Sequence, residues 1–352
     1  MYKILCSVLW LWATASSAKT FFSYADIAEQ AIPGVVNIRT KSYVRRDPHL
    51  DLYEFFMGGK LPRQESTVSL GSGVIITQDG QIITNYHVIK DASRIDILFA
   101  NSKKLAQADV IGVDRKTDLA LLKVNVSWPL TVLTLGDSKS LRVGDIAIAI
   151  GNPFGYSHTV TQGIISAKGR VIGAGPYDNF LQTDATIHPG NSGGPLLDLR
   201  GRVIGINTAV SRRGGGIGFA IPINLAKKIV ADLNRHGKVR RPWVGIVGKN
   251  ILSDNDLDQG VEQSGIYGVI IANLIVDAPA HQAGVRIGDL LMQFDHKKVF
   301  DVHALQRHLS QRQIGDQVHL RLYRRGQGYL NVKLVLEEVP RSRDLPDEAD
   351  LF

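Results

Sequence analysis

Short apolar or alternating runs, separated by turn residues such as Gln78-Asp79-Gly80, fill most of the chain between residues 35 and 220. Such runs are typical of short strands with at least one buried face. They predict six strands at 35–38, 69–77, 82–84, 94–99, 108–113 and 119–124, and six more at 145–151, 162–168, 181–183, 195–198, 203–208 and 217–220. The first two-thirds of the chain is therefore expected to be mainly β.

Apolar residues recur at helical spacing in two segments that flank these strands, 24–31 and 222–236. The second segment has a proline at its first position and a glycine at 237, which are common residues at the start and end of a helix. Its apolar face consists of Leu225, Ile229, Val230 and Leu233.

The chain has 352 residues, which is too long for a typical single core and predicts more than one domain. A basic run at 235–242 reads as a linker, because the composition changes after it. Residues 243–339 then form a second domain. In that domain Val302, Leu305 and Leu309 share a helix face, which could line a binding groove or simply belong to the core.

The N-terminal residues 1–18 read as a signal peptide. Lys3 precedes an apolar run, and small residues up to Ala18 follow it. The run is shorter than a membrane span of about 20 residues, so a retained short anchor is the second interpretation. The single cysteine, Cys6, lies in this segment, and the mature chain is therefore expected to have no disulfide.

The formal net charge is +8, which raises the question of nucleic acid as a partner. The basic residues are scattered, however, and their one dense cluster falls in the linker. We therefore expect no nucleic-acid binding, and assign the charge to solubility or to attraction by an anionic membrane surface.

A serine lies among glycines in the run Gly-Asn-Ser-Gly-Gly at 190–194. Glycines let the backbone approach a substrate closely, as an acyl-transfer nucleophile requires. The backbone amides of Gly190, Asn191 and Ser192 are then candidates for an oxyanion hole. Taken alone, the run could equally be a glycine-rich turn with an ordinary serine.

His87 and Asp118 supply the partners that a serine nucleophile needs, a base and a carboxylate that orients the base. The order His, Asp, Ser is that of chymotrypsin-like barrels and differs from the orders in subtilisins and α/β-hydrolases. An α/β-hydrolase also needs a helix directly after its serine, and Gly193-Gly194-Pro195 would break one.

Several motifs together resemble the HtrA (Deg) family of serine proteases, over residues 24 to 338. They are Thr84-Asn85-Tyr86-His87-Val88, Thr117-Asp118-Leu119-Ala120, Gly151-Asn152-Pro153, Gln182-Thr183-Asp184-Ala185, Gly190-Asn191-Ser192-Gly193-Gly194 and Gly216-Ile217-Gly218-Phe219-Ala220-Ile221-Pro222. The resemblance implies a chymotrypsin-like double β-barrel protease domain at 19–234, with the site in the cleft between the barrels. One α+β PDZ domain follows at 243–339.

The resemblance also implies roles for individual residues. The segment Ile206, Asn207 and Thr208 would pair with the substrate backbone as an added strand. Ile187 and Val210 would line a small apolar pocket for the residue before the cut. Arg170 would be a regulatory sensor in the loop 169–179. The loop Trp243, Val244, Gly245 and Ile246 would bind the C-terminal carboxylate of a peptide.

Three further segments have expected roles. Residues 41–67, which contain Phe55-Phe56, resemble the family's regulatory loop. The aromatic residues Phe21, Phe22 and Tyr24 are candidates either for a trimer contact or for capping the barrel core. The tail 340–352 is expected to be disordered and acidic. A sharper hypothesis places its Leu351-Phe352 end in a PDZ groove of its own trimer.

The resulting prediction is a PDZ-regulated serine endopeptidase of the cell envelope, similar to the DegS and DegQ types. It would be a periplasmic homotrimer, attached to the membrane if its N-terminus is retained, that cleaves unfolded or regulatory proteins in quality control or stress response. The alternative is a peptide-binding holdase in which proteolysis is secondary, while the peptide-binding features argue against a non-peptide esterase. No metal or organic cofactor is expected, because no ligands are grouped at metal-binding spacing.

Overall fold

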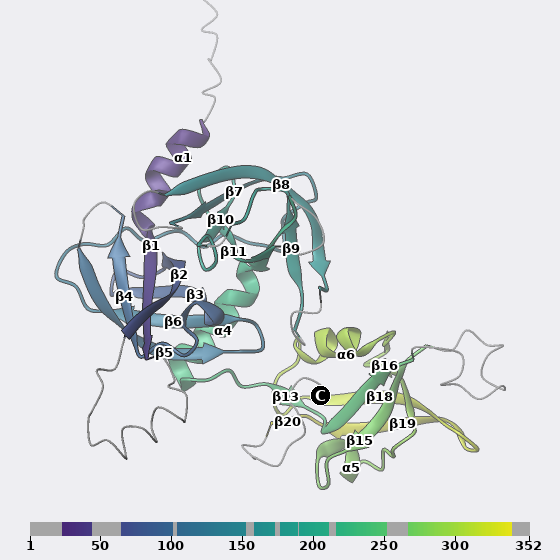
Figure 1. Cartoon of the computed structure of the whole chain (residues 1–352). Helices are drawn as coiled ribbons and strands as arrows, with labels where there is room; N and C mark the ends of the chain where they lie inside the picture. Colours follow the sequence, from purple (N-terminus) through teal and green to yellow (C-terminus); the bar gives the residue numbers. More distant parts are fainter. Residues whose placement is uncertain are drawn as a thin grey trace, which may run out of the picture.

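The computed structural model describes residues 23–43, 65–100, 104–152, 158–172, 177–188, 190–210, 216–251 and 267–339. Figure 1 shows two neighbouring barrels and a further domain joined to them by the segment after α4. The predicted signal peptide, residues 44–64 of the predicted regulatory loop and the predicted acidic tail lie outside the described residues.

The first barrel confirms the six predicted strands and closes in the order β1-β2-β3-β6-β5-β4. Its strands are β1 (Val35–Tyr43), β2 (Glu65–Ile75), β3 (Gln81–Asn85), β4 (Arg94–Phe99), β5 (Leu105–Asp114) and β6 (Leu119–Val124). The strands β1, β2 and β5 extend beyond the apolar runs that predicted them, because ladder pairing continues through polar residues such as Arg39 and Gln107.

The second barrel also closes, in the order β10-β11-β12-β9-β8-β7. Its strands are β7 (Ile146–Gly151), β8 (Thr159–Arg170), β9 (Phe180–Thr183), β10 (Pro195–Leu197), β11 (Val203–Val210) and β12 (Gly218–Pro222). Because the barrel is closed, each strand pairs with a neighbour on both sides. Neither barrel therefore has an edge strand that is unpaired over its full length.

Helix α1 (Tyr24–Ala31) and helix α4 (Ile223–His236) pack against one core that draws side chains from both barrels. Helix α1 begins at a capping box between Ser23 and Asp26. Helix α4 ends where Gly237 adopts a left-handed conformation, with φ of 67°. The buried face of α4 is rotated from the predicted one: Leu225 and Val230 are only half-buried, and the buried residues are Ile223, Ala226, Ile229 and Leu233.

The C-terminal domain has a sheet in the order β14-β15-β16-β18-β19, with β17 paired to β16. Its elements are β14 (Ile246–Asn250), β15 (Val269–Leu274), α5 (Pro279–Gln282), β16 (Leu290–Phe294), β17 (Lys297–Lys298), α6 (Val302–Leu309), β18 (Gln317–Arg324) and β19 (Gly328–Val335). Leu305 and Leu309 of α6 belong to the core, and Val302 is half-buried beside it. Strand β14 is an edge strand with α6 next to it.

The linker is short, and its C-terminal end pairs with the last strand of the C-terminal domain. Strand β13 (Pro242–Trp243) pairs with β20 (Glu337–Glu338), and the Glu338 carboxylate contacts the ammonium of Lys238 and the guanidinium of Arg240. The hydrogen bond from Lys238 is the main cause that lowers the pKa of Glu338, and the hydrogen bond from Arg240 adds to it. The basic linker cluster is thus partly neutralised by the end of the C-terminal domain.

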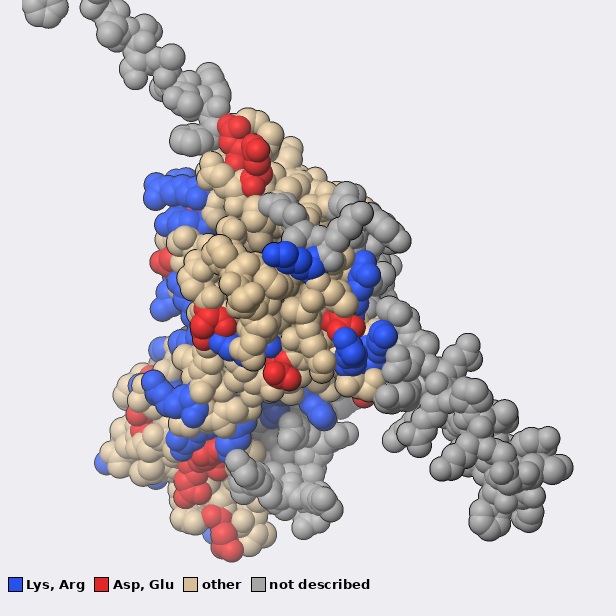
Figure 2. Space-filling view, turned by 90° about the vertical axis from the view of Figure 1, so that its left-hand side faces the viewer, with Lys and Arg blue, Asp and Glu red and all other residues tan. Residues whose placement is uncertain are grey.

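Lysine and arginine side chains on the face shown in Figure 2 are spread among aspartate and glutamate side chains. This agrees with the scattered charge expected from the sequence. Within the described residues, no helix has the length and apolar character needed to cross a membrane.

His158 forms a contact between the barrels that should respond to pH. Its Nε2 atom lies 3.2 Å from the Val35 carbonyl oxygen. Burial lowers its pKa from the ordinary value of 6.5, and the hydrogen bond to Val35 only partly offsets this. The folded protein therefore binds this proton less readily than the unfolded chain. The stability contributed by neutral His158 is complete above pH 6.5 and is lost as the pH falls through the lowered pKa.

When the pH falls from about 7.5 to 5, the Tm of both proteins should decrease. We expect the decrease to be about 2 °C smaller for the His158→Gln variant than for the unmodified protein. Thermal denaturation followed by circular dichroism measures this difference. His236→Gln, at the exposed end of α4, is the matched control for the loss of a histidine side chain. Equal slopes for His158→Gln and the unmodified protein would contradict the assignment.

Candidate active site

The structure brings His87 and Asp118 together at the edge of the first barrel. His87 lies in the short helix α3 (Tyr86–Ile89), directly after β3, and Asp118 lies in the turn between β5 and β6. The Nδ1 atom of His87 is 2.7 Å from Oδ2 of Asp118, and the backbone N–H of His87 donates to Oδ1 at 2.9 Å. The carboxylate therefore holds both the ring and the backbone of the histidine.

The backbone of Asp118 is itself held in an unusual conformation. Its φ is 56°, in the left-handed region that side chains other than glycine seldom adopt. Its carbonyl oxygen accepts hydrogen bonds from the N–H of Tyr86 at 3.1 Å and from Nδ2 of Asn85 at 3.0 Å. These bonds compensate for the strain and aim the carboxylate at His87.

A third hydrogen bond reaches Asp118 from the second barrel. Thr208 Oγ1, on β11, donates to Oδ2 of Asp118 at 2.7 Å. The carboxylate thus joins the two barrels at the point where the candidate base sits. The sequence motifs predict only a role in substrate pairing for Thr208.

Ser192 precedes β10, in the second barrel, with its hydroxyl turned toward β11. The hydroxyl donates to the Thr208 carbonyl oxygen at 3.2 Å, and in the described part of the chain it forms no hydrogen bond with His87. Catalytic hydrogen bonds are often loose before substrate binds, so this geometry is compatible with a nucleophile that turns toward its base on binding.

The glycines around Ser192 are required by close backbone contacts. Gly193 has φ of 84°, and a Cβ there would lie 2.2 Å from the carbonyl oxygen of Ser72. A Cβ on Gly194 would lie 2.3 Å from the carbonyl oxygen of Ile150. The loop is therefore pressed against both barrels, and this contact explains the glycines that the sequence motif displays.

Of the three amides predicted for the oxyanion hole, that of Asn191 already donates to the carbonyl oxygen of His188, at 2.9 Å. This leaves the amides of Gly190 and Ser192 as the candidate pair. The side chain of Asn191 is fully buried, and neither of its polar atoms has a hydrogen-bond partner among the described residues.

The predicted substrate-pairing segment needs a shift along β11. Ile206 pairs with Pro195 of β10 on one side and with Ile221 of β12 on the other. Asn207 donates to the carbonyl oxygen of Gly194 and accepts from the N–H of Gly193, so both positions have occupied edges. The ladder to β10 ends at Ile206, whereas β11 continues to Val210, paired there only with β12 among the described strands.

Two of the remaining predicted residues lie on the second barrel. Ile187 is buried against Gly218 of β12, where a Cβ would come within 2.5 Å of Ile187 Cγ1. Arg170 ends β8 with an exposed side chain, and its Nε donates to Oε1 of Gln182 at 2.8 Å. Val210 ends β11, and its side chain lies outside the described part of the structure.

The loop from Trp243 to Ile246 leads into β14, the edge strand beside α6. Gly245 has φ of 81°, and a Cβ there would lie 2.1 Å from that of Ala278. The carbonyl oxygens of Val244 and Gly245 accept hydrogen bonds from Ala280 and Ile275, respectively. These contacts fix the loop next to β14, which is an edge strand among the strands that the structure describes.

Nothing in the sequence pattern pointed to Asp114 or to its partner Arg241 in the linker. One guanidinium nitrogen of Arg241 lies 2.5 Å from Oδ2 of Asp114, and Thr117, next to Asp118, also donates to this carboxylate. Burial would lower the pKa of Arg241, but the charge and hydrogen bond of Asp114 outweigh burial and raise it. The linker therefore contacts the turn that carries Asp118.

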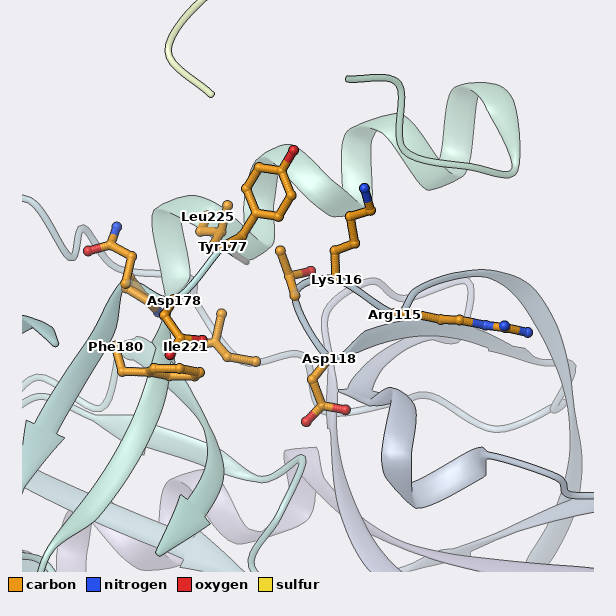
Figure 3. Close-up of a pocket in the computed structure, with 11 residues that line it drawn as sticks. Arg115, Lys116, Asp118, Tyr177, Asp178, Phe180, Ile221 and Leu225 are labelled. Atoms are coloured by element: carbon orange, nitrogen blue, oxygen red, sulfur yellow. The ribbon is translucent and has the colours of Figure 1, made fainter. Parts of the chain in front are cut away.

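Tyr177 connects this linker contact to the predicted sensor loop. The guanidinium of Arg241 lies 4.5 Å from the centre of the Tyr177 ring. In Figure 3, Tyr177 and Lys116 lie beside α4, over a cavity of about 40 Å³ whose far end is formed by Asp118. Among the described residues, no group of His, Cys, Asp and Glu side chains could hold a metal ion.

Comparison with known families gives two matches. Residues 71–206 match the trypsin-like peptidase domain, and residues 238–334 match the PDZ domain. The first match lies within the segment 19–234 expected to be the protease domain, and the second overlaps the predicted PDZ segment 243–339 but begins in the predicted linker.

Two similar proteins carry the name probable periplasmic serine endoprotease DegP-like. The protein from Bartonella henselae is 35% identical over 96% of this chain and 74% of its own length. The protein from Rickettsia conorii is 39% identical over 94% of this chain and 69% of its own length.

Solved structures agree with this. The HtrA-type protease AlgW with a decapeptide has a TM-score of 0.75 and 35% identity, covering 91% of this chain and 100% of its own. The serine endoprotease from Yersinia pestis has a TM-score of 0.68 and 34% identity, covering 90% and 98%.

Replacing Gly193 by alanine should strongly reduce the reactivity of Ser192, because the new Cβ would collide with the carbonyl oxygen of Ser72. The rate of Ser192 labelling by a fluorophosphonate should fall at least about 100-fold, as for loss of an oxyanion donor. Gly201→Ala is the matched control: its φ of 69° is also left-handed, but the nearest atom to its Cβ is 3.8 Å away. Similar losses in the two variants would show that backbone strain, and not contact with Ser72, matters.

Proposed function

Because the chain belongs to the HtrA-type, DegP-like family of serine endoproteases, we propose that it cuts peptide bonds with His87, Asp118 and Ser192 as its catalytic triad. The observation that carries this proposal is the carboxylate of Asp118, which accepts hydrogen bonds from His87 on one barrel and from Thr208 on the other. It supports the triad because Thr208, which contacts Asp118 through its hydroxyl, also accepts the hydrogen bond of Ser192 at its carbonyl oxygen.

The first step requires the Ser192 hydroxyl to leave the Thr208 carbonyl and turn to Nε2 of His87. His87 takes the proton as Ser192 Oγ attacks the substrate carbonyl carbon, and later gives it to the leaving amine. Asp118 holds the Nδ1–H tautomer and stabilises the imidazolium. A water molecule, activated by His87, then hydrolyses the acyl-enzyme.

The amides of Gly190 and Ser192 would stabilise the negative oxygen of the tetrahedral intermediates. Substrate would add a strand to β11 at Thr208 to Val210, where the ladder to β10 has ended. Ile187 and Val210 would line an apolar pocket for the side chain before the cut. Backbone pairing of this kind accepts extended chains of varied sequence, which suits unfolded or regulatory protein substrates.

The PDZ domain would bind C-terminal peptides through the Trp243 to Ile246 loop and the open edge of β14. A related HtrA-type protease carries a decapeptide in its solved structure. Regulation would act through Arg170 and the loop 169–179, with the contact of Arg241 as one connection between the PDZ domain and the turn of Asp118. Following the same family, we propose a homotrimer in the periplasm, with residues 1–18 either removed or kept as an anchor.

The chain without residues 1–18 should cleave unfolded casein, and its Ser192→Ala variant should not, with a loss of at least about 10⁴-fold in rate. A peptide that ends in an aromatic residue should stimulate cleavage. Gel electrophoresis of timed digests measures both effects. Cleavage that persists in Ser192→Ala would overturn the triad, whereas failure of both proteins to cleave, with protection of casein from aggregation, would favour a holdase.

Removing Arg241 should weaken the protease, because the Asp114 carboxylate would stay buried without its cation beside Asp118. We expect Arg241→Gln to lower the Tm and to reduce kcat about tenfold, with a smaller change in KM. The double variant Arg241→Gln with Asp114→Asn should recover part of both losses, since neither charge is left unpaired. Arg240→Gln, which loses only a half-exposed ion pair with Glu338, is the control. No recovery in the double variant would argue against the coupling.

A further inference from the structure

Ser72 of β2 makes four hydrogen bonds at the junction of the barrels and is completely buried. Its hydroxyl donates to the carbonyl oxygen of Gly190 at 2.6 Å and accepts from the N–H of Asn152 at 2.8 Å. Its N–H donates to the carbonyl oxygen of Ser192 at 2.8 Å, and its carbonyl oxygen accepts from Thr84 Oγ1 at 2.7 Å. A residue of the first barrel thus contacts the nucleophile loop of the second at two carbonyls.

These bonds fix the peptide planes on either side of the Ser192 amide. In the plane between Gly190 and Asn191, the carbonyl is held by Ser72 and the N–H by His188. In the plane between Ser192 and Gly193, the carbonyl is again held by Ser72 and the N–H by Asn207. The plane between them, which carries the Ser192 N–H, is fixed through its own carbonyl, because Asn191 accepts from Gly194 at 3.0 Å.

The hydroxyl of Ser72 is not explained by the needs of its own barrel. Both of its hydrogen-bond partners, Gly190 and Asn152, belong to the second barrel. The loop also lies directly on this residue: a Cβ on Gly193 would meet its carbonyl oxygen at 2.2 Å, and a Cβ on Gly194 would lie 3.2 Å from its own Cβ. Only a small side chain with both a donor and an acceptor satisfies this position.

We propose that Ser72 is a positioning residue, which holds the nucleophile loop in the shape where the amides of Gly190 and Ser192 converge on the oxyanion. It acts through the loop and does not touch substrate. The proposal rests on the triad proposed above. Without the hydroxyl, the carbonyl of Gly190 would lose its hydrogen bond and the Gly190–Asn191 peptide plane could rotate. This rotation would displace the neighbouring amides of Gly190 and Ser192 and leave the oxyanion hole incompletely formed.

The test compares Ser72→Ala and Ser72→Cys with the unmodified protein on a short fluorogenic peptide. We expect Ser72→Ala to lower kcat about 10- to 100-fold, in the range seen for loss of an oxyanion donor, with KM changed less than about twofold. Binding of a peptide boronic acid, which needs both Ser192 and the oxyanion amides, should weaken by a similar factor. Ser72→Cys keeps a weak donor of similar size and should recover part of kcat.

Ser140→Ala is the control, because this exposed serine also donates to a backbone carbonyl, that of Asp137, but lies away from the loop. Circular dichroism and binding of a C-terminal peptide to the PDZ domain establish that each variant is folded. If Ser72→Ala does not fold, the kcat of Ser72→Cys decides, and it should lie below that of the unmodified protein. Unchanged kcat and boronate affinity in a folded Ser72 variant would overturn the positioning role.

A different result would count against the triad itself. Full cleavage by Ser192→Ala would show that the proposed nucleophile is wrong, whatever Ser72 does. A loss of kcat in Ser72→Ala, together with inactive Ser192→Ala, supports both proposals.

Discussion

The carboxylate of Asp118 is the contact on which the candidate site depends, since three hydrogen bonds from two separate barrels converge on it. A carboxylate in a cleft is costly to desolvate unless its oxygens are satisfied, and here His87 and Thr208 satisfy them. The same bonds orient the imidazole. Stability of the barrel junction and orientation of the base therefore come from one set of interactions.

The loop around Ser192, residues 190–194, is likewise held by hydrogen bonds from both barrels. Ser192 lies on a segment whose carbonyls are bound by Ser72 of the first barrel and whose N–H of Gly193 is bound by Asn207 of the second. Because backbone lies directly against backbone here, positions 193 and 194 admit only glycine. Each barrel thus holds a residue of the candidate site that belongs to the other barrel, so this arrangement requires the two barrels to be docked.

The linker extends this dependence to the PDZ domain. Arg241 ion-pairs with Asp114 in the turn that carries Asp118 and stacks on Tyr177 of the predicted sensor loop. On the other side, β13 pairs with β20 at the end of the PDZ domain. A displacement of the PDZ domain would therefore strain a buried ion pair next to Asp118, and this contact could connect the PDZ domain with the proposed triad.

The local pattern of the sequence was sufficient for the elements and the type of chemistry. Alternating apolar runs predicted twelve strands that the two barrels contain, and the proline and glycine around α4 predicted its ends. The family resemblance, carried by short motifs, supplied the double barrel and the PDZ domain. These features are encoded locally, because periodicity, turn residues and glycine-rich motifs each act over a few residues.

The partners of each residue were decided by tertiary structure alone. Strand register left Ile206 and Asn207 paired on both edges, and it brought Thr208 to Asp118. The contacts of Ser72 with Gly190 and of Arg241 with Asp114 join residues 118 and 127 positions apart. No local pattern specifies such pairs, because they arise only when barrel closure and domain docking bring distant backbone into hydrogen-bonding distance.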